Sequence, residues 1–225
     1  VRILRLCQNT QQGFTLLEMA VVMVVLGLIL GGILMPLSTQ MEKQDRDETQ
    51  NILEEIQEAL IGYAMANGRL PCPDTDGDGM IDMTTICTNV QGTIPWVDLG
   101  LGKNDAWGQP FTYRVTGNFA DSTDGTGCGT ATVGVSFELC STADINILDA
   151  TAGNPVANQI PAIVIAHGRN WATTTSADED ENSDTDTDFV DRRPSMNEAP
   201  TFDDQVIWIS PNVLKNRLVS ARRLP

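Results

Sequence analysis

The sequence predicts an α+β protein in which a long N-terminal helix packs on a small antiparallel β-sheet with loop insertions. Three observations support this fold class. Residues 14–37 are almost wholly apolar, residues 38–68 continue with helical spacing but gain a polar face, and short strand-like runs separated by Gly, Asp and Thr loops occupy residues 69–225. We therefore expect an apolar helix, its amphipathic continuation and one globular β-rich domain.

The apolar segment reads GFTLLEMAVVMVVLGLILGGILMPL over residues 13–37. At about 1.5 Å per residue it is long enough to cross the roughly 30 Å core of a bilayer, so we expect a membrane-spanning helix. Arg2 and Arg5 precede the segment without an acid, which predicts a cytoplasmic start. No small-x-small cleavage site follows it, which argues against a secretory signal peptide.

Glu18 is the only ionisable residue between Phe14 and Leu37. A carboxylate inside a membrane costs a few kcal/mol at the least, so it needs a partner charge. A cut after Gly13 would supply one, because the new α-amino group of Phe14 would lie about one turn from Glu18, or beside Glu18 of a neighbouring copy. The alternative is an ordinary anchor that carries an accidental acid and needs no cleavage.

Gly13 followed by FTLLEMAVVMVVLGLI closely resembles the N-terminal signature of type IV pilins and type II secretion pseudopilins. The resemblance implies that a prepilin peptidase removes residues 1–13 as a leader and methylates Phe14. It also implies that Glu18 is required for methylation and assembly, and that Pro36 is the family's helix-bending proline. We therefore expect one helix from about Phe14 to Asn67, bent near Pro36.

A second element, W-G-x-P-F-x-Y, is similar to the segment of pseudopilins that enters the sheet, and its aromatic residues are expected to anchor the core. Its residues are Trp107, Gly108, Pro110, Phe111 and Tyr113. We expect strands over residues 110–116, 131–140, 161–166 and 206–209, and a C-terminal helix over residues 211–219.

The stretch after the helix has the pattern D-x-D-x-D-G-x-x-D. In a calcium loop, alternate side chains converge on the ion, the sixth residue is a glycine and the seventh contributes its carbonyl oxygen. The expected ligands are Asp74, Asp76, Asp78, the carbonyl of Met80 and Asp82. Because the twelfth position is Thr85 instead of a bidentate Glu, we expect weaker binding or a different geometry. A solvated acidic turn is the alternative.

A second acidic stretch covers residues 176–189, and such a run usually stays solvated or disordered. Major pseudopilins bind calcium in an acidic loop late in the domain, so the resemblance leaves open a second ion site that includes Asp203 or Asp204.

Five cysteines become four when the leader with Cys7 is removed. An even number in an exported domain predicts two disulfides, and of three connectivities we choose Cys72 with Cys87 and Cys128 with Cys140. Zinc is the alternative, but there is no CxxC pair and His167 is the only histidine.

Composition and motifs argue against two further classes of function. A net charge of −16 does not suit nucleic-acid binding. The sequence has no GxSxG, no HExxH and no glycine-rich phosphate loop, so we do not expect an enzyme.

The sequence therefore predicts a structural subunit of a type IV pilus or a type II secretion pseudopilus, pseudopilin-like or minor. Its expected partners are the prepilin peptidase, other pilin subunits and the inner-membrane assembly platform, with calcium as a structural cofactor. We expect the subunit in the inner membrane, with its domain in the periplasm, before it enters the filament. The alternative is a monomeric, membrane-anchored periplasmic or surface calcium-binding module. A tip subunit with its own ligand is a weaker third interpretation.

Overall fold

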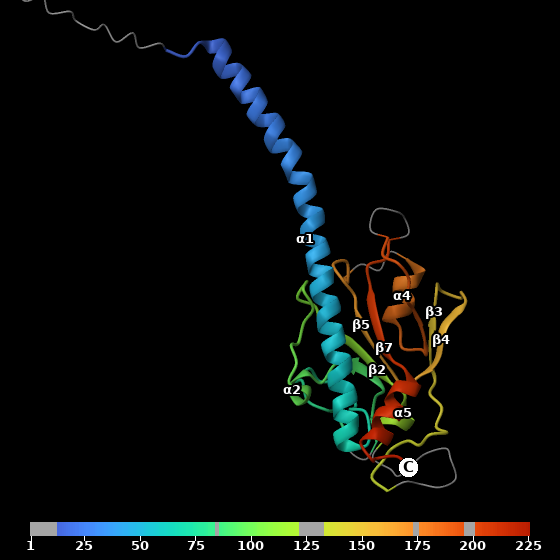
Figure 1. Cartoon of the computed structure of the whole chain (residues 1–225). Helices are drawn as coiled ribbons and strands as arrows, with labels where there is room; N and C mark the ends of the chain where they lie inside the picture. The colour runs from blue at the N-terminus through green and yellow to red at the C-terminus, as the bar shows by residue number, and fades with distance from the viewer. Residues whose placement is uncertain (1–12, 84–85, 122–132, 173–175, 196–200) are drawn as a thin grey trace, which may run out of the picture. The chain divides into compact units, whose positions relative to one another are not determined.

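A computed structural model describes residues 13–83, 86–121, 133–172, 176–195 and 201–225, with the side chains of residues 30–38 excepted. The chain divides into two compact units, Val1–Gln44 and Asp45–Pro225. Helix α1 (Leu16–Asn67) contributes to both units (Figure 1). This confirms one continuous helix over the expected range. The bend near Pro36 stays a prediction, because that side chain lies outside the described part.

Helix α1 ends where Gly68 takes a positive φ of 73° and donates its N–H to Ala64 O over 2.7 Å. A left-handed residue of this kind closes a helix and is usually glycine. Glycine is also required by space, since a Cβ at position 68 would lie 2.1 Å from Gly134 O. The helix end predicted at about Asn67 is therefore confirmed.

The second unit contains a four-stranded antiparallel sheet with the order β1-β2-β5-β7. Its strands are β1 (Gln91–Thr93), β2 (Thr112–Val115), β5 (Ala162–Ala166) and β7 (Gln205–Ile209). Tyr113 pairs with Val164, and Val164 pairs with Ile207 across the sheet. Three of these strands were predicted, whereas the three-residue β1 was not.

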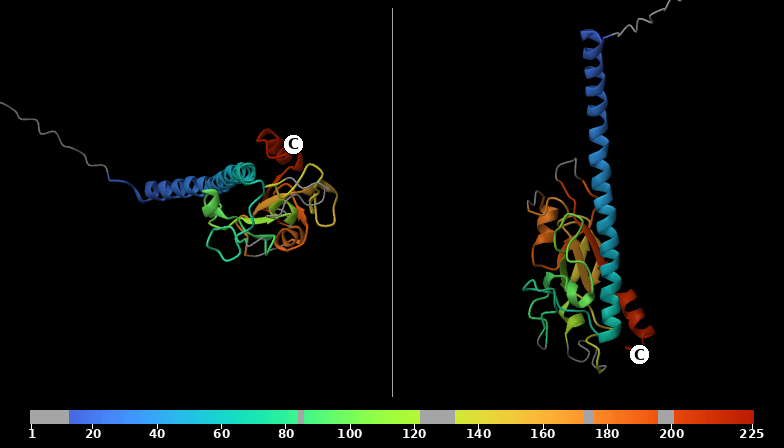
Figure 2. Two further views of the ribbon diagram at one scale, coloured as in Figure 1. Left: turned by 90° about the horizontal axis from the view of Figure 1, so that it is seen from below. Right: turned by 90° about the vertical axis from the view of Figure 1, so that its left-hand side faces the viewer.

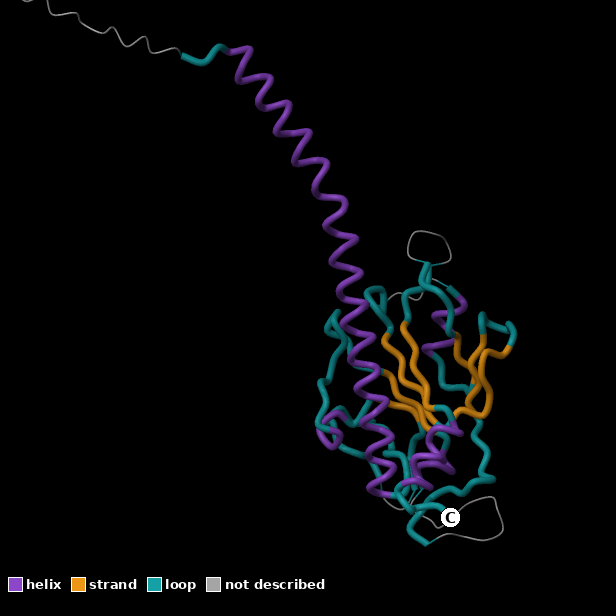
Figure 3. Tube along the Cα trace, in the orientation of Figure 1, coloured by secondary structure: helices purple, strands orange, loops and turns teal. Residues whose placement is uncertain are grey.

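A second, three-stranded sheet with the order β4-β3-β6 was not predicted. It consists of β3 (Ile145–Leu148), β4 (Pro155–Ile160) and β6 (Asp188–Val190). Strand β3 runs antiparallel to β4 and parallel to β6, so the small sheet is mixed. Figure 3 shows the strands of the second unit as two groups.

Strand β5 is buried on both faces, which makes the second unit three-layered. Val164 belongs to the core that contains Leu53 and Ile56 of α1, whereas Ile163 and Ile165 belong to a second core with strands β3 and β6. Because neighbouring residues of a strand point to opposite faces, β5 lies between the helix layer and the small sheet.

Four shorter helices complete the second unit: α2 (Trp96–Leu99), α3 (Gly117–Ala120), α4 (Ala177–Ser183) and α5 (Pro211–Ser220). Helix α5 confirms the predicted C-terminal helix. It begins with Pro211, as helices often do, and buries Leu214 and Leu218 in the same core as α1. Figure 2 shows α5 beside the C-terminal end of α1.

The strand predicted over residues 131–140 is wrong for residues 133–140, which form turns and loop; residues 131 and 132 lie outside the described part. The backbone here bonds locally and to the end of α1: Ser136 N donates to Gly68 O, and Glu138 N donates to Ser141 Oγ. The alternating pattern reflects instead the burial of Val135 and Phe137. Phe137 lies 4.5 Å, centroid to centroid, from Phe119.

Residues 176–189 were expected to stay solvated or disordered. Most of them are exposed or half-buried, but disorder is wrong, because the run contains α4 and the start of β6. Ser176 caps α4 by accepting the N–H of Glu179, and three acids occupy the first turn, where the helix dipole favours negative charge. Asn182 is fully buried and bonds to Val190 in both directions, which fixes α4 against β6.

Candidate assembly helix and metal-binding loop

The N-terminal signature coincides with the start of α1. Thr15 Oγ1 accepts the N–H of Glu18 over 3.2 Å, and helix α1 begins at Leu16. A threonine followed three residues later by glutamate is a capping box, so the sequence starts a helix at this point. Gly13 and Phe14 lie just before the helix and are exposed. The predicted cleavage bond is therefore outside regular structure.

The described side chains of the apolar segment, Phe14 to Ile29, are exposed in the single chain. Leu16 is 92% exposed and Phe14 is 79% exposed. An apolar helix with all its faces open needs an apolar environment or partner helices around it. Among the described residues, none of the helices combines the length and apolarity that crossing a membrane requires.

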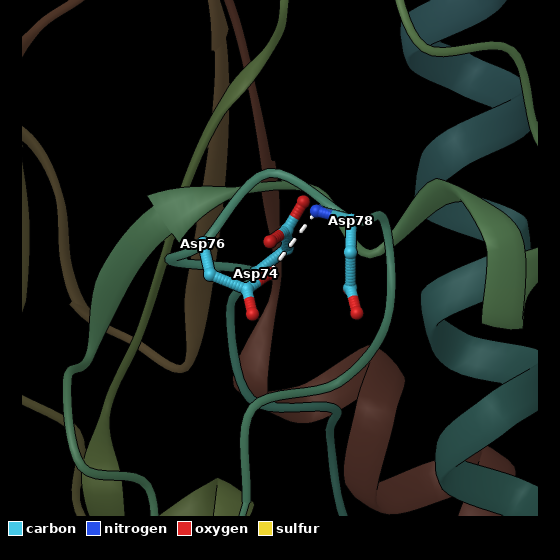
Figure 4. A group of neighbouring side chains, drawn as sticks. All are labelled: Asp74, Asp76 and Asp78. Carbon is cyan, nitrogen blue, oxygen red and sulfur yellow. Dashed lines mark hydrogen bonds between the residues drawn. The ribbon is translucent and has the colours of Figure 1, made fainter.

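The acidic loop brings three of the predicted ligands together (Figure 4). One carboxylate oxygen from each of Asp74, Asp76 and Asp78 lies within 4.8 Å of the others. Asp74 is buried, whereas Asp76 and Asp78 are exposed. Elsewhere in the described chain no second group of three ligands meets this spacing, Asp203 and Asp204 included.

Backbone N–H groups hold the carboxylates in place. Asp74 Oδ1 accepts from Gly77 N over 2.7 Å, and its Oδ2 accepts from Gly79 N over 2.9 Å. Asp76 Oδ1 accepts from Asp78 N over 3.1 Å, which is the bond drawn in Figure 4. Asp78 Oδ1 accepts from Met80 N over 2.7 Å. The loop is thus wound around its own carboxylates.

Asp82 is not among the three converging carboxylates. Its Oδ2 accepts the N–H and the hydroxyl of Thr75, and these bonds lower the pKa of Asp82. The residue closes the loop in this structure. Its role as an ion ligand stays a prediction, as does that of the Met80 carbonyl.

Helix α2 supports the loop from the side, which the sequence pattern did not indicate. Gly79 has a φ of 84°, and a Cβ at this position would lie 2.4 Å from the Trp96 ring. Val97 N donates to Gly79 O, and Asp98 Oδ2 accepts from Ile81 N over 2.8 Å. Gly79 is therefore needed for both conformation and space, and Trp96 directly contacts the loop.

The disulfide between Cys72 and Cys87 is present and confirms that predicted pair. It joins two buried residues that bracket the acidic loop. Cys140 is also disulfide-bonded, whereas Cys128 and Cys7 lie outside the described residues. The described part of the chain thus gives no support for a cysteine zinc site.

The W-G-x-P-F-x-Y element forms the entry to β2, as expected. Phe111 and Tyr113 are fully buried, and Tyr113 Oη donates to Pro71 O over 3.0 Å. Burial raises the pKa of Tyr113 well above its ordinary value. Trp107 and Gly108 lie in a turn organised by Asp105, whose Oδ1 accepts from Trp107 N over 2.9 Å. Phe111 and Tyr113 therefore anchor the core as predicted, whereas Trp107 is half-buried and belongs to neither of the two cores.

A partly buried polar cluster around His167 was not predicted from the sequence. His167 Nε2 lies 2.8 Å from Thr112 Oγ1, and its Nδ1 lies 3.7 Å from Asp204 Oδ1. The order hydroxyl, imidazole, carboxylate is that of a hydrolase triad, but 3.7 Å is too long for a hydrogen bond. The adjoining cavity of about 10 Å³ has room for no more than one water. We assign the cluster to packing.

Asp203 belongs to the same region and is buried. Arg169 N and Asn170 N donate to its Oδ2, whereas its Oδ1 has no hydrogen-bond partner in the described structure. Burial, opposed in part by those two bonds, raises the pKa of Asp203 to about 6. The group therefore titrates close to neutrality.

The chain combines an exposed apolar helix, which begins at the capping box of Thr15 and Glu18, with a small α+β domain. This combination defines a class of filament subunits that assemble through the N-terminal helix. The description "Prokaryotic N-terminal methylation motif" belongs to a family model that matches residues 8–34. The chain is 30% identical over 112 residues to type II secretion system core protein G of Aeromonas hydrophila, covering 50% of this chain and 78% of that protein. The chain belongs to the type IV pilin and pseudopilin family. No solved structure matches it.

Proposed function

We propose that this pilus or pseudopilus subunit is cut after Gly13, methylated on Phe14 and assembled through α1. The observation that carries the proposal is that Glu18 lies in the first turn of a helix whose described apolar side chains are exposed. The match to the methylation motif over residues 8–34 includes the proposed cleavage bond. The similarity to a secretion core protein favours the pseudopilus over the pilus.

In the proposed mechanism residues 14–37 store the subunit in the inner membrane, with the second unit in the periplasm. The assembly platform then transfers the apolar helix into the filament core, where neighbouring copies replace lipid as its apolar environment. There Glu18 pairs with a mature α-amino group, which removes the cost of an unpaired charge. The role is structural and includes no reaction by this chain.

The experiment that tests processing is co-expression of the full chain with and without a prepilin peptidase, followed by intact mass measurement and N-terminal sequencing. We expect a chain that begins at methylated Phe14 only when the peptidase is present. Gly13→Val is the control, because a branched residue before the bond should block cleavage. An uncut wild-type chain would support the monomeric anchored module instead.

We propose further that Asp74, Asp76 and Asp78 bind calcium as a structural ion. Hard oxygen ligands of this kind suit calcium, and the loop already holds the three carboxylates near one another. Bringing three anions together costs energy that a divalent cation would offset. The disulfide and Trp96 hold the loop from two sides, which reduces the ordering that ion binding would require.

Trp96 makes the calcium proposal testable by sensitised terbium luminescence on the purified full chain in detergent. We expect excitation of tryptophan to give terbium emission that added calcium displaces. Asp76→Asn with Asp78→Asn should abolish that emission, whereas Asp180→Asn on α4 is the matched control and should leave it unchanged. Emission that survives the loop variant would assign the ion to another site.

A further inference from the structure

The exposed face of α1 between residues 47 and 58 carries a row of acids. We call this row the acidic strip; it comprises Asp47, Glu48, Glu54, Glu55 and Glu58. Their spacing of one, three, four and seven residues places them on one side of the helix, opposite the buried Leu53 and Ile56. The strip therefore extends for about 17 Å along the helix axis, as two groups of acids at residues 47–48 and 54–58 with the neutral Asn51 between them.

Most of the strip forms no ion pair among the described residues. Glu58 lies 3.8 Å from Arg217, and Glu54 accepts a hydrogen bond from Gln50. For the other three acids the described residues provide no ion pair. Like charges at this spacing repel one another, so the strip is costly unless another molecule neutralises it.

The opposite charge is concentrated at the C-terminal end of the second unit. Residues 211–225 contain four cations and no acid in a chain of net charge −16. Three of the cations are engaged within the chain: Lys215 donates to Leu139 O and Ser141 O, Arg223 donates to Met65 O and Ala66 O, and Arg217 forms the ion pair with Glu58. Arg217 and Arg222 remain exposed, and we call this pair the basic end.

We infer that the basic end of one copy binds the acidic strip of the next copy in the filament. The inference rests on the proposed function, because it needs copies aligned along α1. The bond between Arg217 and Glu58 places the basic end beside the C-terminal end of the strip. A second copy displaced along the helix axis by about the length of the strip would present its basic end to the unpaired acids.

This contact would be heterologous, since the two surfaces differ. Heterologous contacts repeat from copy to copy and build open filaments, whereas a self-complementary contact closes a dimer. The contact also addresses a general problem of this chain. Cleavage after Gly13 removes Arg2 and Arg5, so copies in the filament are more acidic than the full chain with its net charge of −16. They repel one another, and an assembly contact therefore gains from a segment of opposite sign.

Charge reversal in the full chain, expressed with its peptidase and assembly machinery, tests the contact. Glu54→Lys with Glu55→Lys changes the strip, and Arg217→Glu with Arg222→Glu changes the basic end. We expect each double variant to lower the yield of sheared filaments roughly tenfold. The quadruple variant, which combines all four substitutions, should restore most of the wild-type yield. Asp180→Lys with Asp186→Lys reverses two charges elsewhere and should keep the wild-type yield.

Separate outcomes distinguish this inference from the proposed function. If wild-type chains form no filaments, the proposed function fails before the contact is tested. If the wild type and every variant assemble equally, the function stands and the contact is overturned. Loss in both double variants without recovery in the combination also overturns it, because the two surfaces would then have different partners. As a second readout, Glu55→Cys with Arg222→Cys should give a ladder of crosslinked copies.

Discussion

Glu18 occupies the first turn of α1 and is also the only carboxylate among residues 14–37. This one side chain therefore has two separate roles. As the last residue of a capping box it helps to start the helix, and as a charge it would pair with a mature N-terminus. Substitutions that keep one property and remove the other separate the two roles.

Glu18→Gln keeps the capping residue type and removes the charge, whereas Glu18→Ala removes both. We expect both variants to insert in the membrane and both to lose filament assembly, because assembly depends on the charge. Glu18→Asp is the control that keeps the charge. The measurement is sheared filament yield together with the mass of the mature chain. Normal assembly of the glutamine variant would limit Glu18 to capping.

Asp203 should make stability depend on pH. Its folded pKa of about 6 lies above the ordinary value of 3.8, so the folded chain holds the proton more tightly than the unfolded chain. Protonated Asp203 therefore adds about 3 kcal/mol to the free energy of unfolding. This stabilisation is fully present below about pH 4 and is lost as the pH rises through about 6. Thermal melts between pH 4 and 7 in the presence of a chelator should show a decline that Asp203→Asn flattens. An unchanged slope in that variant would assign the decline to other groups.

At the scale of elements, the disulfide from Cys72 to Cys87 and the acidic loop should act together. The bond closes a segment with a sequence separation of 15 residues that contains all three converging carboxylates. Cys72→Ser with Cys87→Ser should cost about 3 kcal/mol of stability and weaken terbium binding. Urea melts and terbium titration without reductant measure the two effects. Equal terbium affinity in both proteins would show that the loop orders itself.

Arg223 provides a second link between elements, because it donates to carbonyls in the last turn of α1, which has no basic residue of its own. Unpaired carbonyls at a helix end are stabilised by such donors. Arg223→Ala should lower the free energy of unfolding by about 1 kcal/mol. Arg222→Ala, one residue earlier and exposed, is the matched control for thermal melts. Equal loss in both variants would point to general charge effects.

The helices and central strands could be predicted because each has a local cause. Gly68 stops α1, Pro211 starts α5, and the run from Ala162 to Ala166 is apolar because both faces of β5 are buried. The acidic loop was predicted for the same reason, since its residues are neighbours in sequence. Its support by Trp96 could not be predicted, because that contact joins the loop to helix α2, which lies about 17 residues further along the chain.

The errors in prediction arise where tertiary contacts override a local pattern. Val135 and Phe137 alternate like a strand, but the backbone between them bonds to Gly68 O and leaves the sheet. The small sheet was missed because β6 lies far from β3 in sequence, and because β4, which directly follows β3, is mostly exposed. Residues 177–183 are acidic enough to suggest disorder, yet Ser176 and the buried Asn182 hold them as a helix.

At the scale of the whole molecule, the cores that stabilise the fold lie in the second unit, whereas the apolar helix segment proposed to enter the filament core lies in the first unit. The buried hydrophobic residues that the structure describes run from Leu53 to Leu224, and the two cores lie within the second unit. The described apolar side chains of the first unit up to Ile29 are exposed. Arg46 holds the start of the second unit, donating to Asp203 O and accepting from Gln205.

A chain that lacks residues 1–40 should therefore fold alone, because it keeps both cores and the Arg46 bonds. We expect a cooperative thermal transition within about 5 °C of the full chain, an intact bond between Cys72 and Cys87, and no incorporation into filaments. Deletion of residues 1–60 is the comparison and should prevent folding, since it removes Leu53, Ile56 and Leu60 from the main core. If the shorter deletion also fails to fold, then the first unit contributes to the stability of the domain and the two roles are not separate.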